Sequence, residues 1–378
     1  MDGMNQPRLL FVGTDEGWRA AAQSAADRRG AVLDVMPDVK SALSSMLPPG
    51  LVYEHVMAVA PLRSRAIDAL AGMLDEVTLS QTPLLLLGCA SSGTAMQLPC
   101  VETATGEAVL NALGGNQPAF EPMAPMQWPE FVATLHSGGL RMRFQPILRA
   151  ADLQPIGLEA LARLHHGKRG ILHPRDFIPL MATSGRERVF TGIAAARTFL
   201  EVGARLKQAE LFVTLNLPLS AVMHDLAVER GIELCKVADA SPNEIIIEVL
   251  ESRTAPDLGR LREALQRWHA AGFRTAIDDA GPALPHWLDL LDLPFDVVKL
   301  DGAMVANPGQ QGLLERITGE AKARGRIVVA EGVEDEACLG RVMALDVDAL
   351  QGFLFSRPLP AMAVPIWLDR WRQDRTLN

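Results

Sequence analysis

Cysteine and tyrosine are scarce in this chain. Among its 378 residues there are one tyrosine and four scattered cysteines, Cys89, Cys100, Cys235 and Cys338, with no C-x-x-C pair. This spacing favours neither a zinc–thiolate site nor a disulfide framework, and it is typical of proteins from a reducing compartment. We therefore expect a cytoplasmic protein whose cysteines fill the core.

Long apolar runs are missing as well. The run LLLLG at 84–88 is far shorter than the roughly 20 residues that a membrane span needs. The N-terminal sequence MDGMNQPRLL has no basic region followed by an apolar stretch, so we expect no secretory signal. The sequence predicts no association with a membrane.

The chain also has no excess of basic residues. The net charge is −9, and no basic run is interleaved with aromatic residues, which disfavours binding to DNA or RNA. An acidic protein that acts on a phosphate ester needs positive charge at its site. Metal ions held by carboxylates would supply that charge.

The chain divides at a segment rich in glycine and proline, residues 114–130, which we interpret as a linker. Before it, residues 1–113 alternate between short apolar strands and helical stretches, which predicts a small doubly wound α/β domain with a parallel sheet. After it, residues 131–378 repeat the alternation on a larger scale. Eight strands over about 240 residues predict a (β/α)8 TIM-type barrel. An open doubly wound sheet is the alternative, which we disfavour because no glycine-rich phosphate loop follows the first strand.

Polar groups end seven of the eight barrel strands, where a soluble core would not accommodate them. Strand ends of a barrel converge on one face, so these groups should meet there. They are Glu159, Asn216, Glu248, Asp278 with Asp279, Lys299 with Asp301, Glu331 and Gln351. A single acid at a strand end more often caps a helix or faces solvent, but that explanation is poor for seven successive strands.

The set provides oxygen ligands, which suit Mg²⁺ or Mn²⁺ rather than zinc. Asp279 and Glu331 could hold a second ion beside the first, and the pair of ions would clamp a phosphodiester during hydrolysis. Lys299 could orient the attacking water, with Asp301 as its charge partner. Glu331 is placed to act either as a base or as a metal ligand. By contrast, we expect His165 and His166 to lie on a solvated loop.

Eight motifs, in order, make the C-terminal part resemble the EAL-type cyclic di-GMP phosphodiesterases. The resemblance covers about residues 128–372. The motifs are FQPI (144–147), EALAR (159–163), LNLPLS (215–220), EVLES (248–252), DD (278–279), KLD (299–301), EGVE (331–334) and QGFLFSRPLP (351–360).

The resemblance implies a role for each matching residue. Glu159, Asn216, Glu248 and Asp278 would bind the first metal ion, and Asp278, Asp279 and Glu331 the second. Lys299 and Gln351 would lie near the catalytic water, with Glu251 and Glu334 as supporting acids. Gln145, Pro146, Arg163 and Asp301 would contact the substrate. The implied reaction is hydrolysis of cyclic di-GMP to linear pGpG with two Mg²⁺ or Mn²⁺ ions. We expect Ca²⁺ to inhibit it, and a homodimer is usual in the family.

Two positions depart from the family pattern. The stretch that usually reads DDFGTGYSS is DDAGPALPH here, so Ala280 replaces an anchoring phenylalanine, and Pro282 and Pro285 restrict the backbone. Leu250 stands where the family has a threonine. Loss of such supporting contacts typically weakens metal affinity or activity about 10–100-fold. We therefore expect a slow enzyme, and the alternative is an inactive cyclic di-GMP receptor that signals through protein contacts.

The N-terminal domain resembles a response-regulator receiver in its order of strands and helices. A working receiver needs an acidic pocket, a phosphoacceptor aspartate after its third strand and a lysine after its fifth. Here only Asp15 and Glu16 follow the first strand, Met57 stands near the place of the aspartate, and the lysine is missing. We expect a pseudo-receiver that makes contacts with an unknown protein partner. A small α/β domain of unrelated origin is the alternative.

Overall fold

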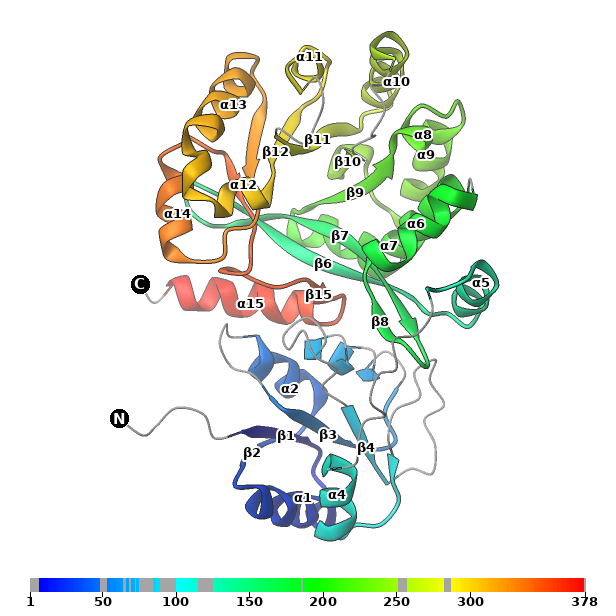
Figure 1. Cartoon of the computed structure of the whole chain (residues 1–378), viewed down its shortest axis with the longest axis vertical. Coiled ribbons are helices and arrows are strands. Elements are labelled where there is room, and N and C mark those ends of the chain that lie inside the picture. Colours follow the sequence, from blue (N-terminus) through cyan, green and yellow to red (C-terminus); the bar gives the residue numbers. More distant parts are fainter. Residues whose placement is uncertain are drawn as a thin grey trace. The chain divides into compact units, whose positions relative to one another are not determined.

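The structure is a computed structural model of the whole chain (Figure 1). It describes residues 7–47, 53–63, 66–67, 69–71, 73–74, 84–88, 100–114, 125–184, 186–250, 257–281 and 287–376.

The N-terminal part contains a five-stranded parallel sheet. Its strands are β1 (Arg8–Val12), β2 (Val32–Met36), β3 (His55–Val59), β4 (Leu84–Leu87) and β5 (Cys100–Val101). Their order in the sheet is β2-β1-β3-β4-β5, which is the order of flavodoxin-like doubly wound folds. The predicted small α/β domain with a parallel sheet is confirmed.

Helix α1 (Glu16–Arg29) of this part begins and ends at residues that are typical of helix caps. It starts at Asp15, whose carboxylate accepts a hydrogen bond from the Trp18 N–H, and it ends at Gly30 with φ of 65°. Helices α2 (Val39–Met46) and α4 (Gly106–Gly114) also belong to this part. Met57 is fully buried in the core that the sheet forms with α1 and α4. The likeness of this part to a receiver stays a prediction.

The C-terminal part contains a ten-stranded sheet that closes into an eight-stranded barrel through a pairing of β6 with β7. Two short strands, β8 (Gly170–Leu172) and β15 (Leu359–Pro360), flank the barrel strands in the sheet order. The barrel strands are β6 (Leu140–Arg149), β7 (Pro155–His166), β9 (Phe212–Pro218), β10 (Ile245–Leu250), β11 (Arg274–Ala280), β12 (Val297–Leu300), β13 (Ile327–Ala330) and β14 (Ala349–Leu350). The predicted TIM-type barrel is confirmed.

One strand runs against the others. Strands β7 and β9 to β14 are parallel neighbours, but β6 pairs with β14 in the antiparallel sense. The first barrel strand therefore cannot bring its carboxyl end to the same face as the other seven. A residue of β6 reaches that face from within the strand.

Helices follow most of the strands, as in a TIM barrel. Helix α7 contacts β9, α10 contacts β11 and α13 contacts β13 (Figure 1). The described helices of this part are α5 (Trp128–His136), α6 (Pro174–Ser184), α7 (Glu187–Ala209), α8 (Leu219–Val222), α9 (Ala227–Ala238), α10 (Leu258–Ala270), α11 (Trp287–Leu291), α12 (Gly302–Ala306), α13 (Gln311–Ala323), α14 (Glu336–Met343) and α15 (Ala363–Thr376). None of the described helices is long and apolar enough to span a membrane.

A layer of apolar side chains fills the barrel interior. It consists of Ile147, Ile246, Ala276, Val297, Val329 and Ala349, each from a different strand and at most 5% exposed. Side chains of a strand alternate between two faces, so the residue two positions further points the same way. On the five parallel strands of this layer, that residue is a polar one: Glu248, Asp278, Lys299, Glu331 and Gln351. The barrel thus has an apolar layer covered by a polar layer.

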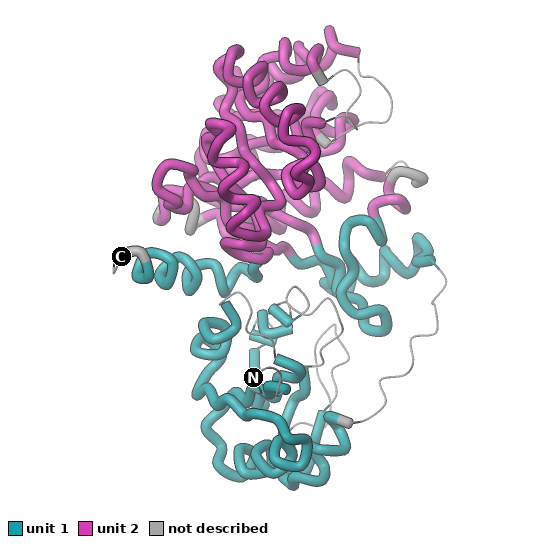
Figure 2. The backbone as a smooth tube through the Cα atoms, turned by 60° about the vertical axis from the view of Figure 1, so that its left-hand side comes forward, with its two compact units in different colours: residues 1–141, 163–177, 359–378 teal, residues 142–162, 178–358 magenta. Residues whose placement is uncertain are grey.

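By spatial contacts, the chain separates into two compact units (Figure 2). One consists of residues 1–141, 163–177 and 359–378, and the other of residues 142–162 and 178–358. Every residue of the polar layer lies in the second unit.

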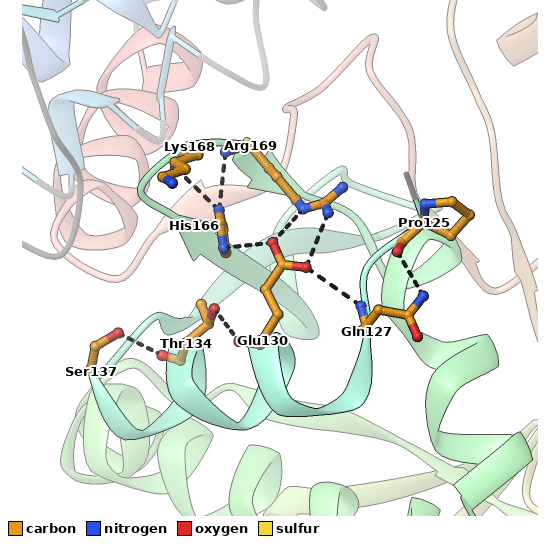
Figure 3. Close-up of polar contacts among 8 residues, drawn as sticks. All are labelled: Pro125, Gln127, Glu130, Thr134, Ser137, His166, Lys168 and Arg169. Atoms are coloured by element: carbon orange, nitrogen blue, oxygen red, sulfur yellow. Dashed lines mark hydrogen bonds and ion pairs between the residues drawn. The ribbon is translucent and has the colours of Figure 1, made fainter. Parts of the chain in front are cut away.

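The loop predicted at His165 and His166 is wrong, because strand β7 continues through both residues and pairs with β8. His165 is 1% exposed. The Nδ1 atom of His166 accepts hydrogen bonds from the backbone N–H groups of Lys168 and Arg169, at 3.1 Å each. Its Nε2 atom lies 3.1 Å from a carboxylate oxygen of Glu130, which Arg169 also binds (Figure 3). The histidine holds a tight strand turn rather than facing solvent.

Candidate metal centre

Lys299 lies at the centre of the polar layer. Its side chain is 2% exposed, and its Nζ atom is 2.5 Å from Oε1 of Glu331, 2.9 Å from Oε1 of Glu248 and 3.0 Å from Oδ1 of Asp278. Oε1 of Glu159 follows at 3.7 Å. Four acids from four strands, far apart in sequence, therefore converge on one ammonium group as the sequence predicted, although Glu159 does so from within β7 rather than from its end.

The lysine is charged at neutral pH. Burial by itself would lower its pKa, but the negative charges of Asp278, Glu159, Glu248 and Glu331 together raise the pKa well above its usual value. One ammonium faces four carboxyl groups, so negative charge is in excess once all four are ionised. That excess favours the binding of further cations.

Glu248 shows the excess most clearly. It is 0% exposed, and apart from the ion pair of its Oε1 atom with Lys299 at 2.9 Å, neither of its oxygens has a hydrogen-bond partner among the described residues. Burial raises its pKa well above the usual value, in spite of Lys299 nearby. Burial likewise raises the pKa of Glu331 to about 8. Buried carboxylate oxygens without hydrogen-bond donors fit a bound divalent cation, which takes oxygen ligands.

Two amides fix Glu159 from both sides. Nδ2 of Asn216 donates to its Oε1 at 3.0 Å, and Nε2 of Gln351 donates to its Oε2 at 2.6 Å. Because Asn216 uses its NH₂ group for this bond, its carbonyl oxygen is the atom that could face a metal ion. The metal-ligand role of Asn216 stays a prediction.

Gln351 also connects the acids to β6. Its Nε2 atom donates to Oε1 of Gln145 at 3.1 Å, and Nε2 of Gln145 donates to the carbonyl oxygen of Ser356 at 3.1 Å. Gln145 precedes Ile147 by two positions, so on the reversed strand it belongs to the polar layer. Contact with Ser356 is a feature that the sequence motifs did not reveal.

A distortion of β11 brings two adjacent acids to the same place. Neighbours in a regular strand point to opposite faces. Here the register with β12 shifts between Ile277 and Ala280, and Asp279 has a φ of 49°. Asp278, Asp279 and Glu331 consequently each offer an oxygen within 4.8 Å of the others. This all-oxygen group fits the second metal site proposed from the sequence.

Asp279 differs from its neighbour in exposure. The residue as a whole is exposed, whereas Asp278 is 8% exposed. Partial burial of its carboxylate, together with the negative charges of Asp278 and Asp301, raises the pKa of Asp279 to about 6. The second group of acids thus lies nearer to solvent than Glu248 does.

Gly352, which follows Gln351, has no room for a side chain because it lies against the backbone of Val333. A Cβ atom on Gly352 would overlap the backbone nitrogen and carbonyl oxygen of Val333. The N–H of Val333 donates to the carbonyl oxygen of Gln351 at 3.1 Å, and the Leu354 N–H donates to that of Val333 at 3.0 Å. The segment after Glu331 and the segment after Gln351 therefore lie against each other, which fixes both side chains.

Asp301 is not the charge partner of Lys299, so that prediction is wrong. Its Oδ1 atom accepts a hydrogen bond from the Ala303 N–H at 2.7 Å and caps helix α12. The partners of Lys299 come instead from neighbouring strands. Glu334 is exposed. Its supporting role stays a prediction, as does the substrate-binding role of Asp301.

The remaining candidates lie on β6 and β7 or outside the described residues. Pro146 is buried on β6, and Arg163 is 5% exposed on β7. Glu251 and residues 282–286, with Pro282 and Pro285, are outside the described residues, as is the side chain of Leu250. Of the altered loop, Ala280 is described, and it is 1% exposed.

Comparison with known proteins places the chain in a family. The EAL domain profile matches residues 130–358. An uncharacterized signaling protein of Caulobacter vibrioides is 31% identical over 238 residues, which is 60% of this chain and 28% of that protein. The cyclic di-GMP phosphodiesterase RocR of Pseudomonas aeruginosa is 27% identical over 241 residues, 61% of this chain and 60% of RocR. The matched part thus spans less than two thirds of either relative.

Solved structures agree with this assignment. The PaMucR phosphodiesterase in complex with c-di-GMP is 26% identical, with a TM-score of 0.59 over 62% of this chain and 98% of that chain. Klebsiella pneumoniae BlrP1, in a complex with calcium and c-di-GMP, is 26% identical, with a TM-score of 0.53 over 63% of this chain and 59% of that chain. The barrel, its polar layer and the profile match lead to one conclusion: the chain belongs to the EAL domain family.

Proposed function

We propose that this protein hydrolyses one phosphodiester bond of cyclic di-GMP to give linear pGpG, with two Mg²⁺ or Mn²⁺ ions. The observation that carries the proposal is the group of four carboxyl groups around Lys299. Among the described residues, the buried oxygens of Glu248 have no hydrogen-bond partner beyond their ion pair with Lys299. Relatives named as cyclic di-GMP phosphodiesterases support the choice of substrate.

The ligands divide between two ions. Glu159, Asn216, Glu248 and Asp278 would hold one ion, and Asp278, Asp279 and Glu331 the other. When bound, the ions supply positive charge to the phosphate and lower the pKa of a bound water. The structure supports this division by the proximity of Asp278, Asp279 and Glu331 and by the free carbonyl oxygen of Asn216.

The chain's own residues then handle the proton and the water. The water oxygen bonds to phosphorus, the bond from phosphorus to one ribose O3′ breaks, and that oxygen takes up a proton from solvent. Glu331 would accept the proton of the attacking water. Lys299, 2.5 Å from Glu331, would hold the water oxygen and stabilise negative charge on the phosphate. Gln351 would keep Glu159 in position.

Binding of the dinucleotide would involve Gln145, Pro146, Arg163 and Asp301. Gln145 is 8% exposed, and both ends of its amide are bonded within the protein. It would therefore present a fixed edge to the substrate. Asp301, two residues after Lys299, is held by its hydrogen bond from the N-terminus of α12 and would present its carboxylate to the substrate.

A second candidate is a receptor that binds cyclic di-GMP without turnover. Burial of Ala280 favours it, because the site where the family has an aromatic ring is filled here without one. On either function, we infer that residues 1–113 form a pseudo-receiver for an unknown protein partner, followed by a linker at 114–130. Residues 131–378 would form the EAL barrel domain. We also propose that the protein is a homodimer and is cytoplasmic.

A turnover assay separates the two candidates. The purified protein is incubated with cyclic di-GMP and Mg²⁺ or Mn²⁺, and pGpG is measured by anion-exchange chromatography. Binding is measured by calorimetry with Ca²⁺ in place of these ions, since Ca²⁺ is expected to inhibit turnover. Appearance of pGpG supports the enzyme, binding without pGpG supports the receptor, and neither binding nor product overturns both.

A further inference from the structure

A cavity lies outside the barrel wall, on the face of β9 and β10 that is turned away from the metal centre. Helices α7, α8 and α9 cover this face. The cavity has a volume of about 280 Å³. Its lining residues come mainly from α7, β9, α8, α9, β10 and α10. An apolar cavity of about 150 Å³ holds benzene, so this one would accommodate a ligand of about a dozen non-hydrogen atoms.

The floor of the cavity is apolar. Leu215 and Leu217 of β9, Ile247 of β10 and Trp268 of α10 line it and are each at most 7% exposed. The indole N–H of Trp268 already donates to the carbonyl oxygen of Val222 at 3.1 Å, so the ring offers the cavity its apolar surface. Such a floor favours an aromatic or aliphatic group of the ligand.

The rim of the cavity is basic. Arg188 of α7 and Arg230 of α9 line it and are exposed, and within the described part of the chain neither guanidinium forms an ion pair. His224 lines it as well, and no Asp or Glu is among the described lining residues. In a protein with a net charge of −9, an apolar site whose charged lining residues among those described are two arginines favours an anionic ligand.

The cavity and the metal centre share two strands. Leu215 and Leu217 flank Asn216 on β9, and Ile247 precedes Glu248 on β10. Asn216 is also paired in register with Glu248, and Leu215 with Ile247. Because successive side chains of a strand point to opposite faces, a group that fills the cavity supports the strands directly behind Asn216 and Glu248.

We propose that this cavity binds a small amphipathic carboxylate and that its occupancy strengthens metal binding by Asn216 and Glu248 through β9 and β10. The carboxylate lies between Arg188 and Arg230, and its aromatic or aliphatic part lies on Leu215, Leu217 and Trp268. Filling the cavity restricts the movement of the two strands. When a metal ion then binds, the strands lose less conformational freedom, so the entropic cost of metal binding is smaller. The regulatory part rests on the proposed metal centre.

The binding test uses 2-naphthoate, which has 13 non-hydrogen atoms by its formula, roughly the size that the cavity volume allows. Titration calorimetry on the full chain, without metal or nucleotide, should show binding. Uncharged 2-naphthylmethanol, or an Arg188→Ala/Arg230→Ala double variant, should bind at least about tenfold more weakly, as expected for loss of a charge-assisted contact. Equal affinity for the acid and the alcohol would overturn the assignment of an anionic ligand.

A matched pair of glycine variants tests whether the ligand binds in this cavity. Gly192 lines the cavity from α7, and a Cβ there meets no atom within 4 Å; the same is true of Gly319, which is on α13 and does not line it. Gly192→Phe should abolish binding of 2-naphthoate, whereas Gly319→Phe should leave it unchanged. Binding that survives Gly192→Phe, or that is lost equally in both variants, would overturn the location.

The coupling test measures Mn²⁺ affinity by calorimetry with and without 2-naphthoate. We expect at least a threefold increase in affinity, and by linkage the same factor for 2-naphthoate when Mn²⁺ is present. Unchanged or weaker Mn²⁺ binding would overturn the regulatory role. No turnover enters these measurements, so failure of the phosphodiesterase proposal and failure of this one are distinguishable.

Discussion

The ammonium of Lys299, on β12, and the carboxyl group of Glu331, the residue directly after the adjacent strand β13, lie 2.5 Å apart. Lys299 is paired in register with Val329, so Glu331 is two residues beyond its direct neighbour. That offset is the stagger of a barrel, in which residues of one layer come from successive positions along neighbouring strands. The close pair depends on the closed sheet and on the alternation of side chains.

Lys299→Met should destabilise the metal-free protein. The substitution leaves Glu159, Glu248, Asp278 and Glu331 without their cation, and loss of one member of a buried charge group typically costs about 3–5 kcal/mol. Chemical denaturation without metal measures the loss. The control is Lys322→Met, whose lysine is 30% exposed and pairs with Asp348, so it should cost about 1 kcal/mol or less. Equal losses in the two variants would contradict the central role of Lys299.

Glu159→Ala should abolish turnover and strongly weaken Mn²⁺ binding. Glu159 is predicted as a ligand, and it also accepts hydrogen bonds from Asn216 and Gln351, both of which lose their partner. Product formation and calorimetric titration with Mn²⁺ measure the two effects. Glu315→Ala, at an exposed position of α13, serves as the control and should retain both. Full turnover by Glu159→Ala would show that the site is elsewhere.

Gly352→Ala should cost about 3 kcal/mol of stability and lower turnover. Its Cβ would overlap the Val333 backbone, so the segments that carry Glu331 and Gln351 must move apart. Gly340→Ala is the matched control, since a Cβ there meets nothing within 4 Å and position 340 lies in helix α14. That change should stabilise by up to about 1 kcal/mol. A Gly352→Ala variant as stable as the wild type would refute the close contact.

Much of this arrangement follows from the sequence, because it depends on strand ends and on alternation. The parallel strands with Glu159, Glu248 and Lys299 were predictable, since each apolar run ends on a polar group. The reversal of β6 was not, because a single strand carries no signal of its direction. Asp279 shows a similar limit: adjacent acids predict opposite faces, and only the shifted register and the φ of 49° bring both to one site.

Two other errors have a common physical cause. The segment at His165 and His166 is polar and is followed by glycine, which indicates a loop, yet tertiary contact with Glu130 and pairing with β8 extend the strand. Lys299 was paired with Asp301 because the two are close in sequence. The acids that contact it come from strands far apart in the chain, and such contacts become visible only in the folded barrel.

Ala280→Phe alone should destabilise the protein by about 1–3 kcal/mol. Ala280 is 1% exposed, so a ring at this position overpacks its surroundings. Replacing residues 280–286 together by the family sequence FGTGYSS should avoid this cost and raise turnover if the altered loop limits the rate. Thermal unfolding and product formation measure the two variants side by side. An unchanged rate in the loop replacement would reject the loop as the cause of slow turnover.

His166 should make stability depend on pH in the range between about pH 7.5 and 5.5. Burial lowers its pKa, and Arg169 and Lys168 oppose a positive charge there, while Glu130 favours it. Because its pKa is lower in the folded state, the unfolded chain takes up the proton more readily below its usual pKa of about 6.5. Stability therefore falls as the pH drops through that value, with a slope of at most about 1.4 kcal/mol per pH unit for one proton.

Comparison with His166→Asn isolates this contribution. Asparagine does not titrate, and its carbonyl oxygen takes the place of Nδ1, which accepts from the Lys168 and Arg169 N–H groups. Hydrogen bonding to Arg169 lowers the pKa of Glu130, so that carboxylate stays ionised throughout the range in both proteins. Denaturation at several pH values should give a constant difference in free energy of unfolding above pH 7 and a steady loss of wild-type stability relative to the variant below pH 6.5. Parallel curves down to pH 5.5 would mean that His166 is solvated as an ordinary surface histidine.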